Sequence, residues 1–154
     1  MTSSEFQNQI NKLSGQLKQA QDKYVNAIKD LKQLSAVKVL EFIMSRGYQY
    51  QETETGFAVK IDDEVYQILT GNIPILTIRK VFKIPENQLD DFSSTAYQIT
   101  CEKPLIKVSV FDNNLVFDLQ SFELDYRHFA HAFDQYLIML NVAIDDFSQI
   151  LMKH

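Results

Sequence analysis

The chain has 154 residues, 45% of them hydrophobic, which suits one domain of ordinary size with a single core. Its formal net charge of -5 argues against a general nucleic-acid binder, because such proteins need positive potential to displace counterions from phosphates. A single cysteine excludes an intramolecular disulfide, and the lack of a long apolar run or a signal-peptide pattern predicts a cytoplasmic protein without a membrane partner.

The charge is unevenly distributed along the chain. Residues 1–46 carry seven basic and four acidic side chains and sum to +3, so the remainder sums to -8. The sequence therefore predicts a mildly basic N-terminal segment followed by an acidic body.

The first part of the chain has a heptad pattern, in which apolar residues recur at alternating steps of four and three. These residues are Phe6, Ile10, Leu13, Leu17, Ala20, Tyr24, Ala27, Leu31 and Leu34. A spacing that averages 3.5 residues keeps one stripe facing a partner helix, as in a coiled coil. We therefore predict a coiled-coil-like helical arm over residues 1–35 that binds a partner through Phe6, Ile10, Leu13, Leu17, Tyr24, Leu31 and Leu34.

Several partners could cover this stripe: a second copy, another protein, or the body of the same chain. The arm's lysines could also touch nucleic acid or an anionic membrane, although its acidic residues and many glutamines favour a solvated exterior. Self-association is favoured over folding back, since a straight 29-residue helix spans roughly 43 Å and would overhang a small domain.

The pattern after the arm predicts a separate domain over residues 36–154. Val37, Leu40 and Ile43 indicate a helix over 36–46, which Arg46 and Gly47 end. Short apolar runs separated by turn residues then indicate strands, and a return to helical spacing indicates two more helices. The expected strands are 48–53, 57–61, 64–70, 75–84, 105–111 and 115–119, and the expected helices are 86–100 and about 125–152.

The final helix is apolar on two faces. Phe129, Phe133, Tyr136, Leu137, Leu140, Ile144, Phe147 and Leu151 share the sector that we expect to face the sheet. Ile138, Met139 and Val142 fall on roughly the opposite side. A helix with two apolar faces needs two neighbours, so we predict that these three residues bind a partner.

This order of elements is joined by particular stretches of sequence: VLEFIMSRGYQYQ, IDDEVYQILTGNIPILTIRKVFKIP and KVSVFDNNLVFDLQSFELDYRHFAHAFDQYLIMLNVAIDDFSQIL. With them the chain resembles the YbjN-like family over about residues 36–152. The resemblance implies a fold similar to that of the type III secretion chaperones. It also implies a small, acidic, often dimeric protein that binds other proteins, as secretion chaperones hold extended client segments against their sheets.

Candidate catalytic and metal-binding residues are few. His128 and His131, with Asp125 and Asp134 at the same interval, could share a metal on one helix face, but two imidazoles without a second motif make an incomplete site. Cys101 has no histidine-bearing signature nearby, which predicts a buried, inert thiol. We therefore predict no metal site, no catalytic residue and no cofactor.

The remaining acidic pairs and glycines fit structural roles. Asp62-Asp63, Asp90-Asp91 and Asp145-Asp146 are explained by one turn and two solvated helix faces. Isolated Gly47, Gly56 and Gly71 form neither a P-loop nor a dinucleotide fingerprint.

The sequence thus predicts an α+β fold, an antiparallel sheet flanked by helices in the order α-β-β-β-β-α-β-β-α, with a long N-terminal heptad helix. The predicted function is a non-enzymatic protein-interaction module, chaperone- or adaptor-like, that binds a protein client and forms a homodimer. One alternative is an enzyme that binds a small ligand or a metal at a site built from residues distant in sequence. Another is a structural subunit of a larger assembly.

Overall fold

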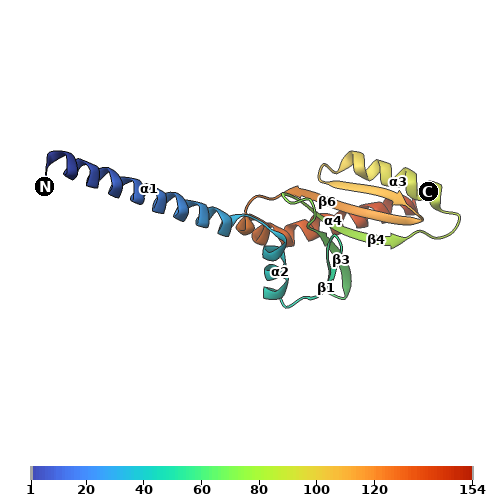
Figure 1. The fold of residues 1–154 in the computed structure, drawn as a ribbon. Coiled ribbons are helices and arrows are strands. Elements are labelled where there is room, and N and C mark those ends of the chain that lie inside the picture. Colours follow the sequence, from blue (N-terminus) through green and yellow to red (C-terminus); the bar gives the residue numbers. More distant parts are fainter. Residues whose placement is uncertain (1, 154) are drawn as a thin grey trace. The chain divides into compact units, whose positions relative to one another are not determined.

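A computed structural model describes residues 2–153, with the side chains of residues 25–32 outside the description. The chain divides into two compact units, Met1–Gln33 and Leu34–His154, which we call the arm and the body. The elements run in the order α1 (Ser3–Lys32), α2 (Ala36–Ser45), β1 (Gln49–Thr53), β2 (Gly56–Ile61), β3 (Glu64–Leu69), β4 (Ile75–Lys83), α3 (Leu89–Glu102), β5 (Ile106–Phe111), β6 (Asn114–Phe122) and α4 (Tyr126–Met152) (Figure 1).

The arm is the single helix α1, and its first turn is closed by a reciprocal cap. The Glu5 backbone N–H donates to the Thr2 hydroxyl at 3.2 Å, and the Thr2 backbone N–H donates to the Glu5 carboxylate at 3.1 Å. This capping box satisfies two of the N–H groups that a helix leaves without intrahelical partners. The TSSE stretch that opens the helix is the sequence signature of this cap.

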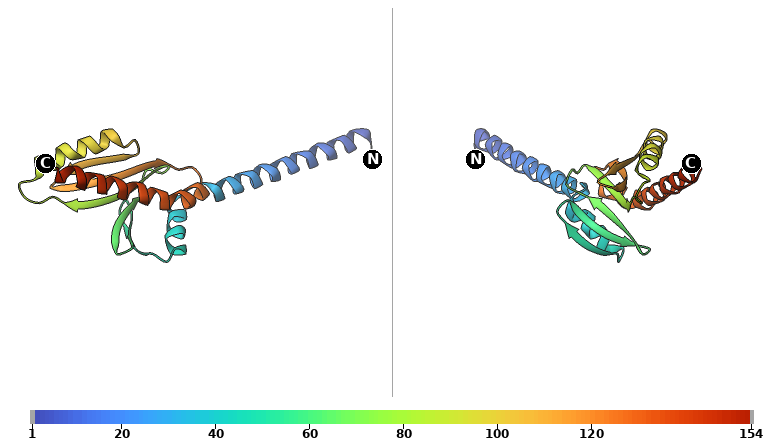
Figure 2. Two further views of the ribbon diagram at one scale, coloured as in Figure 1. Left: turned by 180° about the vertical axis from the view of Figure 1, so that it is seen from behind. Right: turned by 90° about the vertical axis from the view of Figure 1, so that its right-hand side faces the viewer.

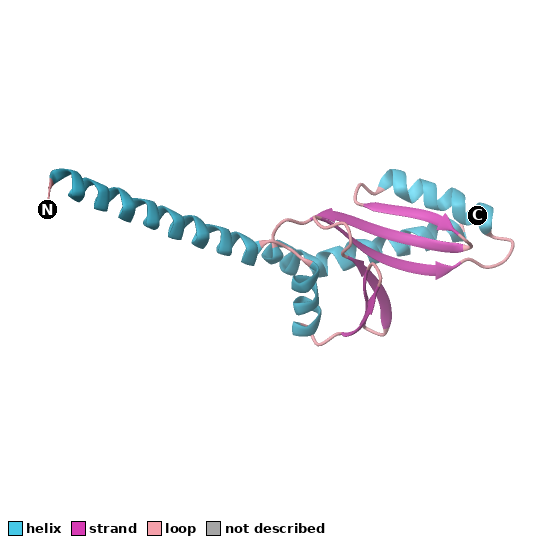
Figure 3. Ribbon diagram, in the orientation of Figure 1, coloured by secondary structure: helices cyan, strands magenta, loops and turns pink. Residues whose placement is uncertain are grey.

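The body is built on one six-stranded antiparallel sheet with the strand order β1-β2-β3-β4-β6-β5. The strands are the magenta arrows in Figure 3. Asp62-Asp63 and Asp112-Asn113 form two tight turns, and all four residues adopt positive φ. Acidic and amide side chains tolerate that backbone region better than most, which is why these turns could be predicted. The strand β4 lies inside the sheet, between β3 and β6.

The long helix α4 covers one face of the sheet, which lies in front of it in Figure 1 and behind it in the left view of Figure 2. Its buried residues are Phe129, Phe133, Tyr136, Leu140, Ala143 and Phe147. Leu137, Ile144 and Leu151 are partly buried against the same core. The sector predicted from the helical period is therefore the one that packs on the sheet.

The helix α2 is held against α4 by aromatic packing. The Phe42 ring lies 5.0 Å from the Phe129 ring and 4.9 Å from the Phe133 ring, measured between centroids, in edge-to-face geometry. The expected apolar face of α2 was partly wrong, because Val37 is exposed and Val39 and Phe42 are buried instead. The buried face of α2 is rotated from the expected one because Phe42 packs against the rings of Phe129 and Phe133.

The edge strand β5 is closed by α3. Thr100 Oγ1 accepts from the Val108 backbone N–H at 2.8 Å and donates to the Val108 carbonyl oxygen at 3.0 Å. One hydroxyl thus satisfies both backbone groups of a residue whose outer side has no neighbouring strand. This is one way in which proteins protect a sheet edge from further pairing.

Thr100→Val is expected to lower the free energy of unfolding by about 1–2 kcal/mol, because it leaves both Val108 groups without partners at nearly constant side-chain volume. Chemical denaturation of the full chain measures the change. Ser94→Ala is the matched control, since Ser94 is exposed on the same helix. An equal loss in both variants would assign the effect to α3 in general rather than to the edge.

The observed architecture confirms the predicted α+β fold class and its order of elements. The boundaries differ by a few residues, most clearly at α3, which begins at Leu89 rather than at 86, and at β6, which extends to Phe122.

Candidate partner-binding surfaces

The predicted stripe of the arm is exposed where its side chains are described. Phe6, Ile10, Leu13, Leu17 and Tyr24 have exposed fractions between 40% and 68%. Their heptad spacing puts them on one side of a 30-residue helix. The side chain of Leu31, also predicted to bind a partner, lies outside the described residues. We call the five described residues the arm stripe.

The positions that flank the arm stripe are nearly uncharged. With Phe6, Leu13 and Ala20 at heptad position d and Ile10, Leu17 and Tyr24 at position a, the flanking positions are e and g. They are Gln7, Gln9, Ser14, Gln16, Gln21 and Lys23. In coiled coils these positions set partner choice through charge. With one charge among six positions, two copies of the arm would meet without a row of like charges.

Leu34 is not part of the exposed stripe, so the prediction that it binds a partner is corrected. It is 2% exposed and belongs to the core of the body, and its backbone N–H donates to the Leu124 carbonyl oxygen at 3.1 Å. Leu34 continues the heptad spacing in sequence but begins the second compact unit. Periodicity alone could not separate the two roles.

The second predicted surface lies on α4 and borders a hollow. Ile138 and Val142 are 55% and 46% exposed, whereas Met139 is partly buried against the core. The hollow has a volume of about 280 Å³ and is lined by Lys103, Pro104, Leu105, Ile106, Gln135, Ile138, Met139 and Val142. The structure thus adds Leu105, from the α3–β5 connection, to the predicted set. We call Leu105, Ile138, Met139 and Val142 the α4 surface.

A buried carboxylate that sequence analysis missed stands at the start of α4. Glu123 is 1% exposed and accepts hydrogen bonds from the Ser121 hydroxyl at 2.7 Å and from the Tyr136 hydroxyl. Its second oxygen lies 2.7 Å from His128 Nδ1. Its backbone N–H donates to the Pro74 carbonyl oxygen at 2.7 Å, so Glu123 ties the end of β6 to the start of α4 and to the loop before β4.

We call Ser121, Glu123, His128 and Tyr136 the Glu123 cluster, and the pKa values of its three ionisable side chains follow from this geometry. Burial alone would raise the pKa of Glu123, but the hydrogen bonds from Tyr136, His128 and Ser121 outweigh it and lower that pKa below its ordinary value. The Glu123 carboxylate raises the pKa of His128 through its hydrogen bond and its charge. Burial, and then the same carboxylate, raises the pKa of Tyr136.

The histidine motif on α4 is dispersed among structural contacts. His128 pairs with Glu123, while the Asp134 carboxylate pairs with the Arg46 guanidinium, whose Nη1 lies 3.0 Å from Asp134 Oδ1. In the described part of the chain, no three His, Cys, Asp or Glu residues are grouped so that they could hold a metal ion. The Asp134–Arg46 pair joins α4 to the end of α2.

Cys101 is exposed, so the prediction of a buried thiol is wrong. The buried residues of α3 are Phe92, Thr95, Ala96 and Ile99. Cys101 follows Ile99 by two positions, and a two-residue step turns a side chain about 200° around a helix. The thiol therefore lies on the solvent side of α3.

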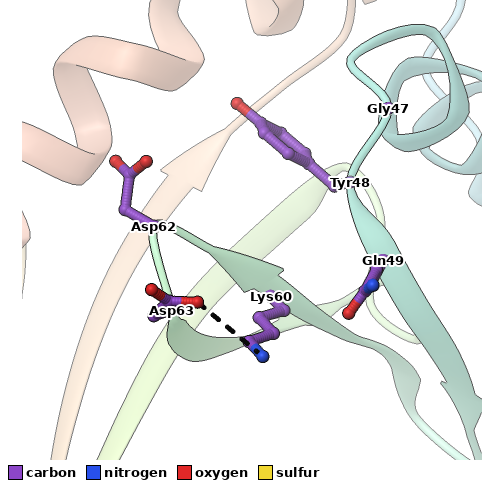
Figure 4. Close-up of a pocket in the computed structure, with 6 residues that line it drawn as sticks. All are labelled: Gly47, Tyr48, Gln49, Lys60, Asp62 and Asp63. Carbon is purple, nitrogen blue, oxygen red and sulfur yellow. Dashed lines mark ion pairs between the residues drawn. The ribbon is translucent and has the colours of Figure 1, made fainter.

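A polar hollow lies where β1 begins beside the β2–β3 turn (Figure 4). It has a volume of about 290 Å³ and is lined by Gly47, Tyr48, Gln49, Lys60, Asp62 and Asp63. Its one drawn ion pair joins Lys60 Nζ to Asp63 Oδ1 at 3.8 Å, between two exposed side chains. None of these residues belongs to the Glu123 cluster, so that cluster and this hollow do not form one site.

Two of these surfaces are apolar and exposed to water. The arm stripe and the α4 surface present aliphatic and aromatic side chains, which gain free energy by leaving water. The side chains of the Glu123 cluster hydrogen-bond to one another and fix the start of α4.

Comparison with known proteins supports the fold. No family model matches the chain, and no curated protein matches it in sequence. Among solved structures, the chain is similar to the crystal structure of YbjN from E. coli, which is described as a proposed transcription regulator. The fold is YbjN-like. The TM-score is 0.57 at 11% sequence identity, over 72% of this chain and 89% of that one.

This similarity confirms the YbjN-like fold that the sequence resemblance implied. None of the described helices has the length and the apolar composition that are needed to cross a lipid bilayer.

Proposed function

We propose that this protein is an adaptor- or chaperone-like interaction module whose arm self-associates and whose body binds a protein client. The observation that carries the proposal is the arm stripe, in which five large apolar side chains at heptad spacing are exposed on a long helix. An isolated amphipathic helix is marginally stable in water, so such a stripe needs a partner helix. A second copy suits it because the flanking positions are nearly neutral.

The client-binding role is supported by the α4 surface. Its exposed apolar groups border a hollow, as in sites that receive one face of an amphipathic segment. Residues 47–154 sum to a charge of -8. The client segment that fits is therefore apolar on one side and basic on its flanks.

A regulatory role would also fit this proposal. YbjN is described as a proposed transcription regulator. If this chain regulates transcription, its acidic body makes contact with another protein a better route than direct binding to phosphates.

The test of self-association is a pair of lysine substitutions in the arm stripe. Leu13→Lys with Leu17→Lys would place charges in the seam of a two-stranded coiled coil, and we expect the dimer dissociation constant to rise at least about 100-fold. Sedimentation equilibrium of the full chain measures this constant, and circular dichroism checks that the helix is retained.

The matched control adds the same charge to the opposite side of the arm. Asn8→Lys with Gln19→Lys occupies outer heptad positions and should leave the dimer intact. Ile138→Lys with Val142→Lys places the same charges on the α4 surface, and it should also leave the dimer intact because the proposed dimer forms through the arm. A wild-type chain that is monomeric at high micromolar concentration would refute self-association.

A further inference from the structure

The two edges of the sheet differ in how their outward backbone groups are satisfied. At β5, Thr100 bonds both groups of Val108, and the Ile106 N–H donates to the Lys103 carbonyl oxygen at 3.3 Å. At the other edge stands β1, whose sequence QYQET is exposed at every residue. The backbone groups of β1 that point away from the sheet follow from its register with β2.

The registers of the β1–β2 and β2–β3 hairpins fix the direction of each backbone group of β1. The Asp62-Asp63 turn makes Ile61 and Glu64 a hydrogen-bonded pair, so the backbone groups of Ile61 point toward β3. Because this direction alternates along a strand, the backbone groups of Lys60 point the other way, toward β1. Lys60 pairs with Gln49, and Ala58 pairs with Gln51. By alternation, the backbone groups of Tyr50 and Glu52 point outward.

These outward groups are open. Among residues 2–153, no backbone or side-chain hydrogen bond reaches the N–H or carbonyl of Tyr50 or Glu52 from outside the sheet. The strand contains no lysine or proline, and its register with β2 runs without a bulge from Gln49 to Thr53, so three of the common protections of an edge are missing. Such an edge is a template for another strand.

We propose that β1 pairs antiparallel with β1 of a second copy, about a twofold axis at Gln51. In this register Tyr50 lies opposite Glu52 of the second copy, so the outward residues of one strand meet those of the other. Each such pair exchanges both of its N–H···O=C bonds. The two six-stranded sheets would then continue as one.

The sequence of β1 is compatible with its own copy in this register. Glu52 faces a tyrosine rather than another glutamate, and Thr53 faces Gln49, so no like charges lie directly opposite. A register shifted to centre on Glu52 would oppose two carboxylates. A register centred on Tyr50 would use Tyr48, whose N–H already donates to the Ile43 carbonyl oxygen at 3.3 Å.

The twofold axis gives a sharp test by cysteine cross-linking. Two Gln51 residues would form a non-hydrogen-bonded pair with Cα atoms about 4.5 Å apart, within reach of a disulfide. Two Thr53 residues would be four positions out of register, about 14 Å apart. The side chains of Gln51 and Thr53 point to the same side of the sheet and are both exposed, so a cysteine at either position is equally accessible.

The experiment uses the full chain with Cys101→Ser as background. Under oxidised glutathione, Gln51→Cys is expected to give cross-linked dimer at least tenfold faster than Thr53→Cys, as measured on non-reducing gels. Equal rates, or monomer alone from Gln51→Cys, would overturn the proposal. The latter result would be expected if the edge takes a strand from a different protein.

Two further variants separate this edge from the arm. Glu52→Pro removes an outward N–H that has no partner in its own sheet, and we expect it to slow Gln51→Cys cross-linking at least tenfold. Glu52→Gln keeps that N–H and should not slow it. Adding Leu13→Lys and Leu17→Lys should leave the preference for Gln51→Cys over Thr53→Cys unchanged, because the register comes from β1; loss of that preference would assign the cross-link to the arm.

Discussion

Phe133→Ala is expected to lower the free energy of unfolding of the body by about 3–5 kcal/mol. Phe133 is fully buried, and its ring lies 4.9 Å from the Phe42 ring and 5.7 Å from the Phe129 ring. Truncation removes the buried apolar surface and leaves a cavity that rigid aromatic neighbours fill poorly. Because small domains are stable by only about 5–15 kcal/mol, the loss would be a large part of the total.

Urea denaturation followed by circular dichroism measures this change, as a lower midpoint at constant slope. Phe111→Ala is the matched control, since it removes the same side chain from a site that is 74% exposed at the end of β5. It should change stability by less than about 0.5 kcal/mol. Similar losses in the two variants would contradict the view that the rings of Phe42, Phe129 and Phe133 join α2 to α4.

The parts of the fold that were predictable are those written in local patterns. Alternating apolar residues located the strands, and Asp62-Asp63 and Asp112-Asn113 marked turns because their side chains tolerate positive φ. The helical period placed Phe129, Phe133 and Phe147 on the sheet side of α4. Each of these signals depends on residues within a few positions of one another.

The parts that could not be predicted depend on residues far apart in the chain. Arg46 meets Asp134 across 88 positions, so nothing near Asp134 distinguishes this structural ion pair from a metal ligand. Leu34 fits the heptad spacing, yet the tertiary fold buries it in the body. The open edge at β1 became visible only once the strand order was known, since each strand alone looks equally able to pair.

Glu123 shows the same limit for the candidate site. In sequence it is a lone acid between Phe122 and Leu124, at the end of a strand, where a solvated loop residue is the ordinary interpretation. Its partners include Tyr136, 13 positions later on α4. The buried carboxylate could have been suspected only from its two apolar neighbours, which is a weak signal.

Glu123→Ala is expected to lower the free energy of unfolding by roughly 3 kcal/mol near pH 6, because it removes the buried acceptor that the Ser121 and Tyr136 hydroxyls share and frees the start of α4. Thermal or urea unfolding of the full chain measures the loss. Glu52→Ala is a suitable control, since that glutamate is exposed on β1 and should cost less than about 0.5 kcal/mol.

The pH dependence of this loss follows from the directions of the pKa shifts. Folding lowers the pKa of Glu123 from its ordinary value of 4.5, so its contribution is present above that value and disappears as the pH falls through the folded pKa. Folding raises the pKa of His128 from 6.5, so the ionic part of its contribution is complete below 6.5 and disappears as the pH rises through the folded pKa. The two contributions overlap between these ordinary values.

The difference in stability between wild type and Glu123→Ala should therefore be greatest between about pH 4.5 and 6.5. It should fall steeply in acid and only slightly in base, because the His128 side chain is 65% exposed and an exposed ion pair contributes less than about 1 kcal/mol. His128→Ala should abolish the fall in base and keep the fall in acid. A difference that is constant from pH 3 to pH 9 would mean that the carboxylate charge has no part in holding α4, and that Glu123 acts only by filling space.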